Sequence, residues 1–483
     1  MRSAHGADAR RFSLGVASGQ PRPDGMVLWT RLTGENLRER ETVRWEVADD
    51  EQFRRIVARG EESAEAAWGH SIHAEPLGLE PGRWYWYRFA ALGERSAAGR
   101  TRTAPASDAQ AALRFVVASC QRYDVGHYAA WRHAAAENPD FVLFLGDYIY
   151  ETASGSNSIR RHEGTVAKTL REYRDRYATY KSDPLLQAAH RGAPWLMVWD
   201  DHEVANDYAG LQSQDLEADF ATRRAAAYQA YWENMPFPKS VRPRGADMRI
   251  AARLDWGTLA RIHLVDDRQY RDPQACPKPG RGGSNTIPLA DCPALVDPKR
   301  SLLGLEQERW LSDGWDAARP WNLLGQQTLM TRFAWGDPAA GSAVYWNDAW
   351  DGYAASRNRL LGVVAAKKLP GVVVLGGDVH SNYVADLKAD FDDPRSPVVA
   401  SEFCGTSITS LSLAQSRVDA VRGFNPHVRF GRSDQRGYLS IELQPARMDV
   451  RLQTVDRPLD PASGITTTAH FVVDAGRPGP HDA

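Results

Sequence analysis

The sequence predicts an α/β protein with an N-terminal immunoglobulin-like β-sandwich (residues 1–104) followed by a layered α/β/β/α domain (residues 105–483). Three observations support this prediction. A chain of 483 residues suits two or three domains better than one small domain. Alternating strand patterns fill the first range, and continuous apolar runs separated by helical stretches fill the second. The four cysteines are too few for a disulfide scaffold, so the core must come from packing.

The N-terminal range has the pattern of an all-β module. Residues 27–31 and 43–47 alternate between apolar and polar side chains, with the two-residue period of half-buried strands. Residues 84–89 follow a Pro-Gly turn and place their aromatic side chains on one face. Short strands separated by turn residues favour a sandwich of the immunoglobulin type. Residues 104–108 then form the expected linker.

The second range alternates between buried strands and helices. Continuous apolar runs indicate strands that are covered on both faces, as in layered α/β domains. Such runs occupy residues 113–118, 141–145, 195–199, 261–265, 321–324 and 372–375. Helical spacing is found in residues 127–137, 165–190 and 216–234, and closing strands are expected from residue 446 onward.

The composition excludes two classes of partner. Lys and Arg number 59 against 61 Asp and Glu, which gives a formal net charge of -2. Specific nucleic-acid recognition and binding to an anionic membrane both normally require a basic excess, so neither is expected. No stretch of about 18 apolar residues is present, so no membrane span is expected.

Two features favour an exported protein. Arg10-Arg11-Phe12 is similar to a twin-arginine signal, although no apolar signal segment follows it. Cys276 and Cys292 flank a loop rich in Pro, Gly and Ser, where a bridge restricts the unfolded chain by roughly 3 kcal/mol. Two free thiols are the alternative. A bridge implies an oxidising compartment, so we expect the mature form of a periplasmic or secreted bacterial protein.

Chemically active residues follow the carboxyl ends of the predicted strands. Ligands bind beyond the carboxyl ends of strands in α/β sheets, so these residues should converge on one crevice. They are Cys120 after the first strand, Asp147 and Tyr150 after the second, Asp200, Asp201, His202, Glu203 and Asn206 after the third, and Asp378 and His380 after a later one.

The residue types at these strand ends are those of a metal site. Carboxylates, an imidazole, a thiol and a phenol repel one another or lack partners unless cations lie between them. Trivalent iron suits Cys120, Tyr150 and His380, whereas calcium or another hard divalent ion suits the Asp and Asn oxygens. Ordinary structural roles are the alternative: a buried Cys120, an aromatic anchor at Tyr150, and an N-cap at Asp201.

These motifs together resemble the PhoD-type alkaline phosphatases, which belong to the calcineurin-like and purple-acid-phosphatase-like metallophosphatases. The resemblance runs nearly from end to end. It is carried by Cys120, by Asp147-x-x-Tyr150-Glu151, by Asp201-His202-Glu203, by Asp378-Val379-His380, and by the stretches 14–19, 24–31, 350–353, 425–427 and 436–438.

The resemblance implies a centre with one iron(III) and two calcium ions, or other divalent metals. Cys120, Asp147 and Tyr150 correspond to iron ligands, with Asp147 placed to bridge two ions. Asp201, Asn206, Asp378 and His380 correspond to the remaining ligands. The chain departs from the family pattern at Asp267, where a small hydroxyl residue is usual, and at Gln326-Gln327, where relatives carry a histidine. We expect Asp266-Asp267-Arg268 to form a structural ion-pair cluster, and Cys404 to lie in the core.

The expected reaction is metal-dependent hydrolysis of phosphate esters by a metal-activated hydroxide. His202 is the expected proton donor at the leaving oxygen, with Asp201 beside it as a second catalytic residue. Glu203 or Asp200 should fix the tautomer of His202. Arg160, Arg161 or Arg357 are candidates for contact with the substrate phosphate.

The expected activity is that of a monomeric alkaline phosphatase acting on small phosphate monoesters and diesters. The alternative is a phospholipase D-like phosphodiesterase that acts on lipid head groups, which the same resemblance allows. A non-catalytic binding module is the third possibility. No C-terminal helix is expected to cap the crevice, which predicts an open site.

Overall fold

The computed structural model describes residues 10–483, so residues 1–9 of the predicted N-terminal domain lie outside the described part. Its α-helices are α1 (Ala129–Ala136), α2 (Leu170–Lys181), α3 (Pro184–Gly192), α4 (Phe220–Asn234), α5 (Leu305–Gly314), α6 (Ala354–Lys367) and α7 (Gln415–Arg422). Its short 3-10 helices are η1 (Arg10–Phe12), η2 (Ala66–Trp68), η3 (Tyr123–Val125), η4 (Lys239–Val241), η5 (Leu289–Asp291), η6 (Pro293–Val296) and η7 (Trp350–Tyr353). Within residues 10–483 no helix is both long and apolar enough to cross a membrane.

Two large sheets form the centre of the molecule. The first has the strand order β24 (Arg477–Asp482), β23 (Ile465–Asp474), β22 (Arg447–Val455), β21 (Gly437–Leu443), β9 (Leu113–Ala118), β10 (Phe141–Phe144), β11 (Trp195–Met197), β1 (Val16–Arg22), β2 (Gly25–Arg31) and β5 (Ser71–Ala74). The second has the order β12 (Ala252–Trp256), β13 (Ala260–Leu264), β15 (Trp321–Gly325), β17 (Val372–Gly376), β19 (Val398–Cys404), β18 (Asn382–Lys388) and β20 (Val428–Arg432).

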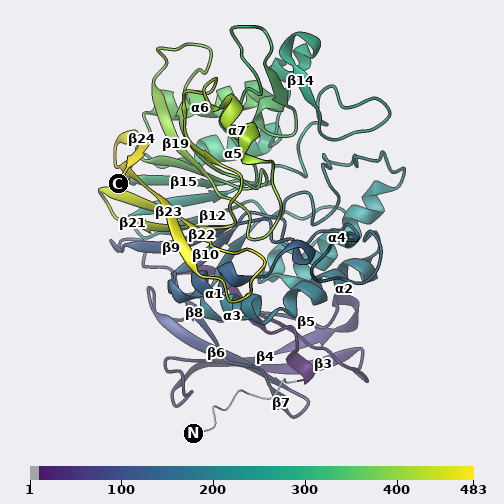
Figure 1. Cartoon of the computed structure of the whole chain (residues 1–483). Helices are drawn as coiled ribbons and strands as arrows, with labels where there is room; N and C mark the ends of the chain where they lie inside the picture. Colours follow the sequence, from purple (N-terminus) through teal and green to yellow (C-terminus); the bar gives the residue numbers. More distant parts are fainter. Residues whose placement is uncertain (1–9) are drawn as a thin grey trace.

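The two large sheets pack face to face between layers of helices, as Figure 1 shows. Alternate residues of β17 demonstrate this arrangement. Val373 lies in the core between the two sheets, whereas Val374 lies in the core under α5 and α6. On the other side, α1 contacts β21 and β22, and α3 contacts β1. The layered α/β/β/α architecture predicted from the continuous apolar runs is therefore confirmed.

The N-terminal part is a sandwich whose second layer is the end of the ten-stranded sheet. Its outer sheet has the order β4 (Ile56–Glu65), β3 (Arg40–Ala48), β6 (Trp84–Ala91) and β7 (Glu94–Arg95), with β8 (Gly99–Arg102) also paired to β6. This sheet packs on β1, β2 and β5, and it lies at the bottom of Figure 1. The sequence predicts the strands of this sandwich, but it does not reveal that β1 continues the ten-stranded sheet.

The continuity depends on close contact between β1 and β11. These strands run parallel, with Gly19 opposite Trp195. A Cβ atom on Gly19 would lie 2.7 Å from the carbonyl oxygen of Trp195 and 2.8 Å from Pro236. Glycine is therefore required at this position, because any side chain would push the N-terminal strands away from the central sheet. The result is one continuous sheet that joins the two parts of the chain.

A further, two-stranded sheet lies at the top of Figure 1. It consists of β14 (Thr286–Pro288) and β16 (Val344–Trp346), which pair in antiparallel fashion. The loop that leads into β14 begins at Cys276, which forms a disulfide with Cys292. Asn347 receives the backbone N–H of Asn285 on its Oδ1 atom at 2.6 Å. These links join the loops that flank β14 to each other and to the segment after β16.

Candidate metal centre

The ends of β9 and β10 bring Cys120 and Asp147 together. The ladder between the two strands continues past their last residues, because the backbone N–H of Cys120 donates to Gly146 O at 3.0 Å. The N–H of Gln121 donates to Asp147 O at the same distance. Gly146 has a φ of 105°, and a Cβ atom there would lie 2.5 Å from the Cβ of Asp200. The tight turn therefore places the end of β10 directly beside the end of β11.

Four of the predicted ligands have a left-handed backbone. The φ angles are 59° at Cys120, 58° at Asp147, 62° at Asp378 and 53° at His380. This conformation costs a residue other than glycine roughly 1–2 kcal/mol. Such strain persists only where the surrounding structure enforces it, and it concentrates at functional sites. Its recurrence in four residues at three separate strand ends marks this region as a site.

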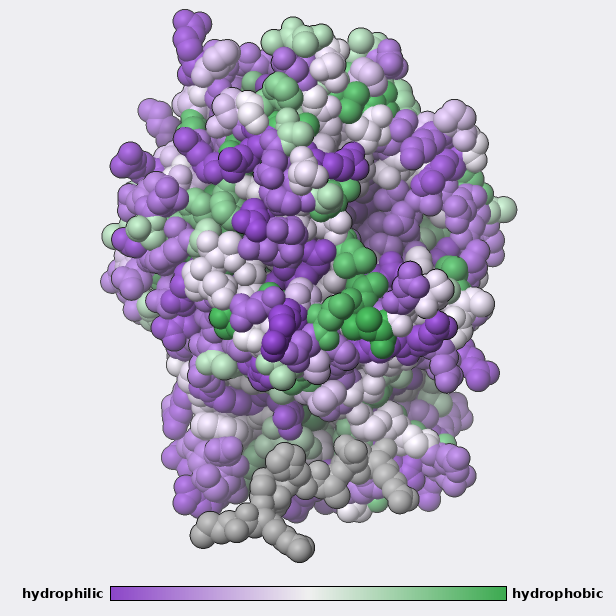
Figure 2. Space-filling model, in the orientation of Figure 1, coloured by the Kyte–Doolittle hydropathy of each residue, from purple (hydrophilic) through white to green (hydrophobic). Residues whose placement is uncertain are grey.

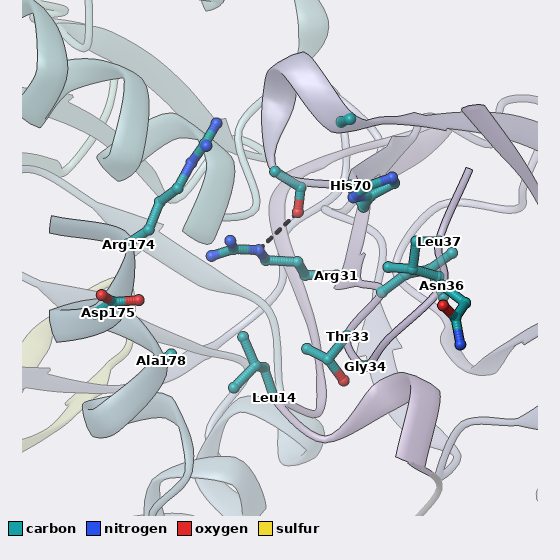
Figure 3. A pocket seen from close by; sticks show the side chains of 13 residues that line it. Leu14, Arg31, Thr33, Gly34, Asn36, Leu37, His70, Arg174, Asp175 and Ala178 are labelled. Atoms are coloured by element: carbon teal, nitrogen blue, oxygen red, sulfur yellow. Dashed lines mark hydrogen bonds between the residues drawn. The ribbon is translucent and has the colours of Figure 1, made fainter. Parts of the chain in front are cut away.

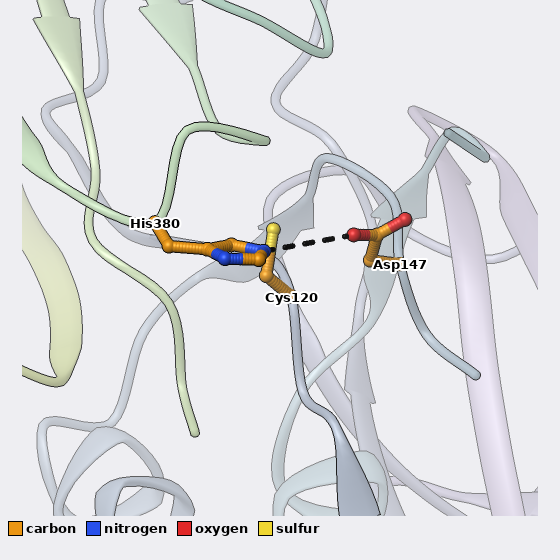
Figure 4. Close-up of side chains that lie close together, drawn as sticks. All are labelled: Cys120, Asp147 and His380. Atoms are coloured by element: carbon orange, nitrogen blue, oxygen red, sulfur yellow. Dashed lines mark ion pairs between the residues drawn. The ribbon is translucent and has the colours of Figure 1, made fainter. Parts of the chain in front are cut away.

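The first group of potential ligands consists of Cys120, Asp147 and His380. One ligand atom from each residue lies within 4.8 Å of the others, and Figure 4 shows the three side chains converging. The Tyr150 hydroxyl donates to Asp147 Oδ2 at 2.8 Å and lies 3.1 Å from His380 Nε2. Ser410, which the sequence did not single out, donates to the same Tyr150 oxygen at 2.6 Å. The phenol therefore belongs to this group.

Two further groups continue from the first. Asp147, Asp201 and His202 form the second, and Asp200, Asp201 and Asp378 form the third. Asp147 is shared by the first two groups and Asp201 by the last two. With Tyr150 included, the structure therefore brings together, from both large sheets, eight of the residues that the sequence places at strand ends. The hydroxyl of Thr328 donates to Asp378 Oδ2 at 2.5 Å. The sequence did not predict this contact.

The carboxylates of the centre carry more negative charge than the neighbouring cationic side chains neutralise. Asp200 Oδ2 and Asp201 Oδ1 are buried and accept no hydrogen bond from any described residue. Burial raises the pKa of Asp200 to about 8, with Asp201 adding to the effect and Arg268 opposing it. Burial also raises the pKa of Asp378 well above its usual range. Oxygen atoms that are buried, unpartnered and mutually repelling fit the binding of cations.

Arg268 lies at the centre of this acidic cluster. Its Nε donates to Asp200 Oδ1 at 2.5 Å, and its Nη1 donates to Asp348 Oδ2 at 2.8 Å. Its Nη2 lies 4.0 Å from Asp378 Oδ1 and makes no described hydrogen bond. Arg268 thus forms the ion-pair cluster expected for residues 266–268. Asp267 is fully buried 3.8 Å from the same guanidinium, and its carboxylate accepts no described hydrogen bond.

The orientation of His202 differs from the prediction. Its Nδ1 lies 2.7 Å from Glu151 Oε2, so Glu151 fixes the tautomer. Glu203 instead accepts backbone N–H groups, including those of Asp147 at 3.1 Å and Asp200 at 2.8 Å. Asp200 is paired with an arginine, as described above. The expectation that Glu203 or Asp200 orients His202 is therefore wrong. Sequence spacing favoured the adjacent acids, whereas the partner comes from the turn after β10.

The imidazole of His202 is also held by stacking and by charge. Its ring centroid lies 4.1 Å from that of Tyr150. Glu151, together with Asp201 and Asp147, raises the pKa of His202 well above its usual range, against the effect of burial. Because Glu151 holds Nδ1, the second ring nitrogen is the one that remains for a ligand or substrate.

Asn206 lies beside the same glutamate. Its backbone N–H donates to Glu151 Oε1 at 2.9 Å, and its side-chain Nδ2 donates to Gln214 Oε1 at 2.6 Å. Its role as a ligand stays a prediction.

The arginines considered for phosphate binding have other roles. Arg160 donates to Asp183 Oδ2 at 2.6 Å, Arg161 to the carbonyl of Ser156, and Arg357 to Asp351 Oδ1 at 2.6 Å. An arginine that was not among these candidates, Arg122, lies with its guanidinium carbon 5.4 Å from the centroid of the Tyr150 ring, and it donates from Nε to Asp124 Oδ1 at 2.8 Å. Its position two residues after Cys120 was the signal in the sequence.

The comparisons with known proteins agree with this geometry. Residues 115–452 match the model of the PhoD-like phosphatases, and residues 2–105 match the model of the N-terminal domain of PhoD-like phosphatases. The chain belongs to the PhoD-like phosphatase family. It is 41% identical over 487 residues to alkaline phosphatase D of Bacillus subtilis (strain 168), with 97% of this chain and 82% of that protein covered.

Solved structures support the same membership. A structure of PhoD matches with a TM-score of 0.92 and 39% identity, and the match covers 99% of this chain and 93% of that one. Purple acid phosphatase PPD1 from yellow lupin (Lupinus luteus) matches with a TM-score of 0.57 over 95% of this chain and 74% of that one. At 10% identity, this second match is a likeness of fold.

The predicted resemblance, fold class and enzyme class are confirmed. This PhoD-like phosphatase is a hydrolase of phosphate esters with the layered metallophosphatase fold. The predicted alternative, a phospholipase D-like diesterase, has no support of its own in these matches. The three groups around Asp147 and Asp201 are positions at which such an enzyme can hold metal ions.

Proposed function

We propose that this chain hydrolyses both phosphate monoesters and phosphate diesters at the centre formed by the three ligand groups. The observation that carries the proposal is the sharing of Asp147 and Asp201 between neighbouring groups. A carboxylate common to two groups can hold two cations close enough to act on one phosphoryl group. Buried carboxylate oxygens without partners support the same conclusion.

The donor atoms suggest which ions the groups would hold. Cys120, Tyr150 and His380, together with Asp147, form a mixed sulfur, nitrogen and oxygen set that suits iron(III). Asp201, Asp378 and Asn206 supply oxygen donors that suit two calcium ions or other hard divalent ions. When bound, these ions supply an activated water for in-line attack and offset the charge of the phosphoryl oxygens.

The residues of the chain itself position the substrate and move the proton. His202 is the proton donor for the leaving oxygen, because Glu151 holds its Nδ1 and stabilises the protonated ring. Asp201 adds negative charge beside the imidazole and receives the backbone N–H of Asp207 at 2.6 Å. Arg122 lies against Tyr150 and adds positive charge at the edge where a phosphate enters.

We further propose that the enzyme acts as a monomer outside the cytoplasm. The disulfide between Cys276 and Cys292 supports this location, because reducing compartments seldom maintain such bridges. Cell fractionation measures the location of the protein, and non-reducing peptide mapping measures the disulfide. A protein recovered in the cytoplasm with both thiols alkylatable would contradict the proposed location.

Metal removal and restoration test the proposed function. We expect prolonged chelation to abolish hydrolysis of p-nitrophenyl phosphate and bis-(p-nitrophenyl) phosphate, and iron with calcium to restore both. Elemental analysis of the purified protein should find iron and calcium together. Phosphatidylcholine, tested in parallel, measures the phospholipase D-like alternative. Full activity after complete loss of metal, or a purified enzyme without iron, would overturn the proposed centre.

A further inference from the structure

A largely apolar groove opens directly beside the metal centre. Its volume is about 880 Å³, and Asp378 and His380 line the end nearest the centre. We call it the apolar groove and define it by six of the apolar side chains that line it. These are Leu329, Phe333, Trp335, Trp346, Val379 and Leu411.

Besides the turn after β17 that it shares with the metal centre, the apolar groove has walls from four separate segments. The loop after β15 contributes Phe333 and Trp335, whose ring centroids are 4.9 Å apart. The β14–β16 sheet contributes Trp346, the segment after β19 contributes Leu411, and α7 contributes Val421. A groove built by convergence of four segments is a feature of the fold and not the gap beneath one loop.

The aromatic wall is held in place from below. Phe333 packs on Tyr383 of β18 with ring centroids 5.0 Å apart, and its backbone N–H donates to Asp351 Oδ2 at 2.8 Å. Arg357 in turn holds Asp351 through a 2.6 Å bond. Because these contacts fix the wall before any ligand binds, the groove is preformed, which lowers the cost of binding.

The rim of the groove exposes apolar side chains that the fold does not need. Leu411 is 66% exposed and Leu413 is 40% exposed, on the segment that also holds the centre. Leu411 O lies 2.7 Å from His380 Nδ1, so the rim and a candidate ligand are directly connected. Figure 2 shows a hollow on the drawn face with a patch of apolar residues along one edge. Exposed apolar residues around a hollow mark a binding surface.

We infer that the apolar groove binds a hydrocarbon or aryl arm of the substrate, so that the preferred substrates are phosphodiesters with one apolar substituent. The inference rests on the proposed function, because it assumes that the phosphoryl group occupies the metal centre. A diester bound there carries a second substituent, and the groove begins at two residues of the centre. Burial of hydrocarbon against Trp335 and Leu411 stabilises the complex, whereas a sugar or a charged arm gains little there.

A series of p-nitrophenyl alkyl phosphates tests the inference. The leaving group stays constant while the alkyl arm grows from methyl to octyl. We expect kcat/KM to rise by up to about fourfold with each methylene that the groove buries, and to level off once the groove is filled. In Trp335→Ala and Leu411→Ser, the octyl-to-methyl ratio should fall at least about fivefold. Leu77→Ser, a similarly exposed leucine in the N-terminal part, should retain the wild-type ratio.

A binding measurement separates this inference from the proposed function. Calorimetric titration of the metal-loaded protein with octylphosphonate and methylphosphonate, which contain no ester bond to hydrolyse, reports on the groove without turnover. Tighter binding of the octyl compound, lost in Leu411→Ser, supports the groove whether or not esters are hydrolysed. A ratio that stays flat along the alkyl series in an active enzyme overturns the inference and leaves the proposed function intact. An unchanged ratio in both variants overturns it as well.

Discussion

Two regions of the molecule bury charged side chains in different ways. The first is the metal centre, where carboxylates from both large sheets meet. The second is the domain seam, where β2 of the N-terminal part meets helices α2 and α4. We define it by Trp29, Arg31, Arg174, Lys181 and Glu233. A pocket of about 510 Å³ opens at this seam, and Figure 3 shows Arg31 and Arg174 on its wall.

The charges at the domain seam are mostly compensated within the chain. Arg174 binds Glu233 through two bonds, with Nε to Oε2 at 2.7 Å and Nη2 to Oε1 at 2.6 Å. Arg31 donates to the carbonyl of Gly69 at 2.7 Å, and Trp29 donates to the carbonyl of Glu233 at 3.0 Å. The bond from Trp29 crosses the boundary. So do the bonds from Arg31 Nη1 to Asn234 Oδ1 at 3.3 Å and from Arg174 Nη2 to the carbonyl of Ala67 at 3.1 Å, and these three bonds join the two parts of the molecule.

The metal centre shows the opposite pattern. Asp200 and Asp201 each leave one buried oxygen unpartnered, and four residues of the centre have strained backbones. Leaving charge buried and unpaired is costly, so a fold retains it only where something from outside completes it. Burial of charge is therefore not by itself a sign of function. The sign is an excess of one charge that no neighbouring residue compensates.

Asp147→Asn should have the largest effect of any single substitution. Asp147 belongs to two of the three groups and receives the Tyr150 hydroxyl, so its loss affects both neighbouring ions. We expect kcat/KM to fall by more than about 10³-fold, beyond the 10- to 100-fold effect of residues that only support ligands. Elemental analysis should find less bound metal in this variant.

The matched control for this variant is Asp175→Asn, whose carboxylate is exposed on α2 in an ion pair with Arg171. It should retain wild-type activity and metal content. Unchanged turnover in Asp147→Asn would favour the non-catalytic binding module over an enzyme.

Glu151→Gln should have a smaller effect that separates orientation from ligation. Glu151 acts through His202, so the substitution should lower kcat by about 10- to 100-fold while KM changes little. Steady-state kinetics on p-nitrophenyl phosphate measures both constants. Glu163→Gln, on an exposed loop of the same chain, serves as the control. An equal loss of kcat in Glu203→Gln, with Glu151→Gln fully active, would restore the original assignment of the tautomer to Glu203.

The sequence predicted the strand ends of the centre correctly and missed the contacts between them. Buried parallel strands have strong apolar runs, and the residues after them converge by topology alone, which is why Cys120, Asp147 and Asp378 could be placed. Glu151 could not be assigned to His202, because that contact depends on how two turns pack. The join of β1 to β11 was equally hidden, since a strand does not reveal its partner.

Lys181 differs from the two arginines of the domain seam, because its charged group lies against two aromatic rings. It is 2% exposed, and its Nζ lies 4.1 Å from the centroid of the Trp29 ring and 5.3 Å from that of Tyr148. Within residues 10–483, none of the ion pairs described includes it. Two aromatic rings thus contact the Lys181 cation, whereas the Arg174 cation is paired with the carboxylate of Glu233. Burial, with a contribution from Arg31, lowers the pKa of Lys181 to about 7.

This lowered pKa makes the stability of the seam depend on pH. Between about pH 7 and 10.5 the unfolded chain binds a proton at Lys181 that the folded chain does not, so stability increases as the pH rises. Below about pH 7 both states bind it, and the full cost of burying the cation remains. Lys181→Met retains the apolar stem without the charge. We therefore expect the variant to be more stable than the wild type by a few kcal/mol at pH 6.5, with the difference shrinking toward pH 10.5.

Urea unfolding followed by circular dichroism at several pH values measures this difference. Lys299→Met, an exposed lysine, should track the wild type at every pH. A gain in Lys181→Met that does not change with pH would mean that the methionine merely packs better. A gain that disappears at alkaline pH shows that the seam, like the metal centre, carries an uncompensated charge. The two regions then differ in how the buried charge is neutralised. Lys181 can release its proton, whereas the carboxylates at the strand ends need cations from outside the chain.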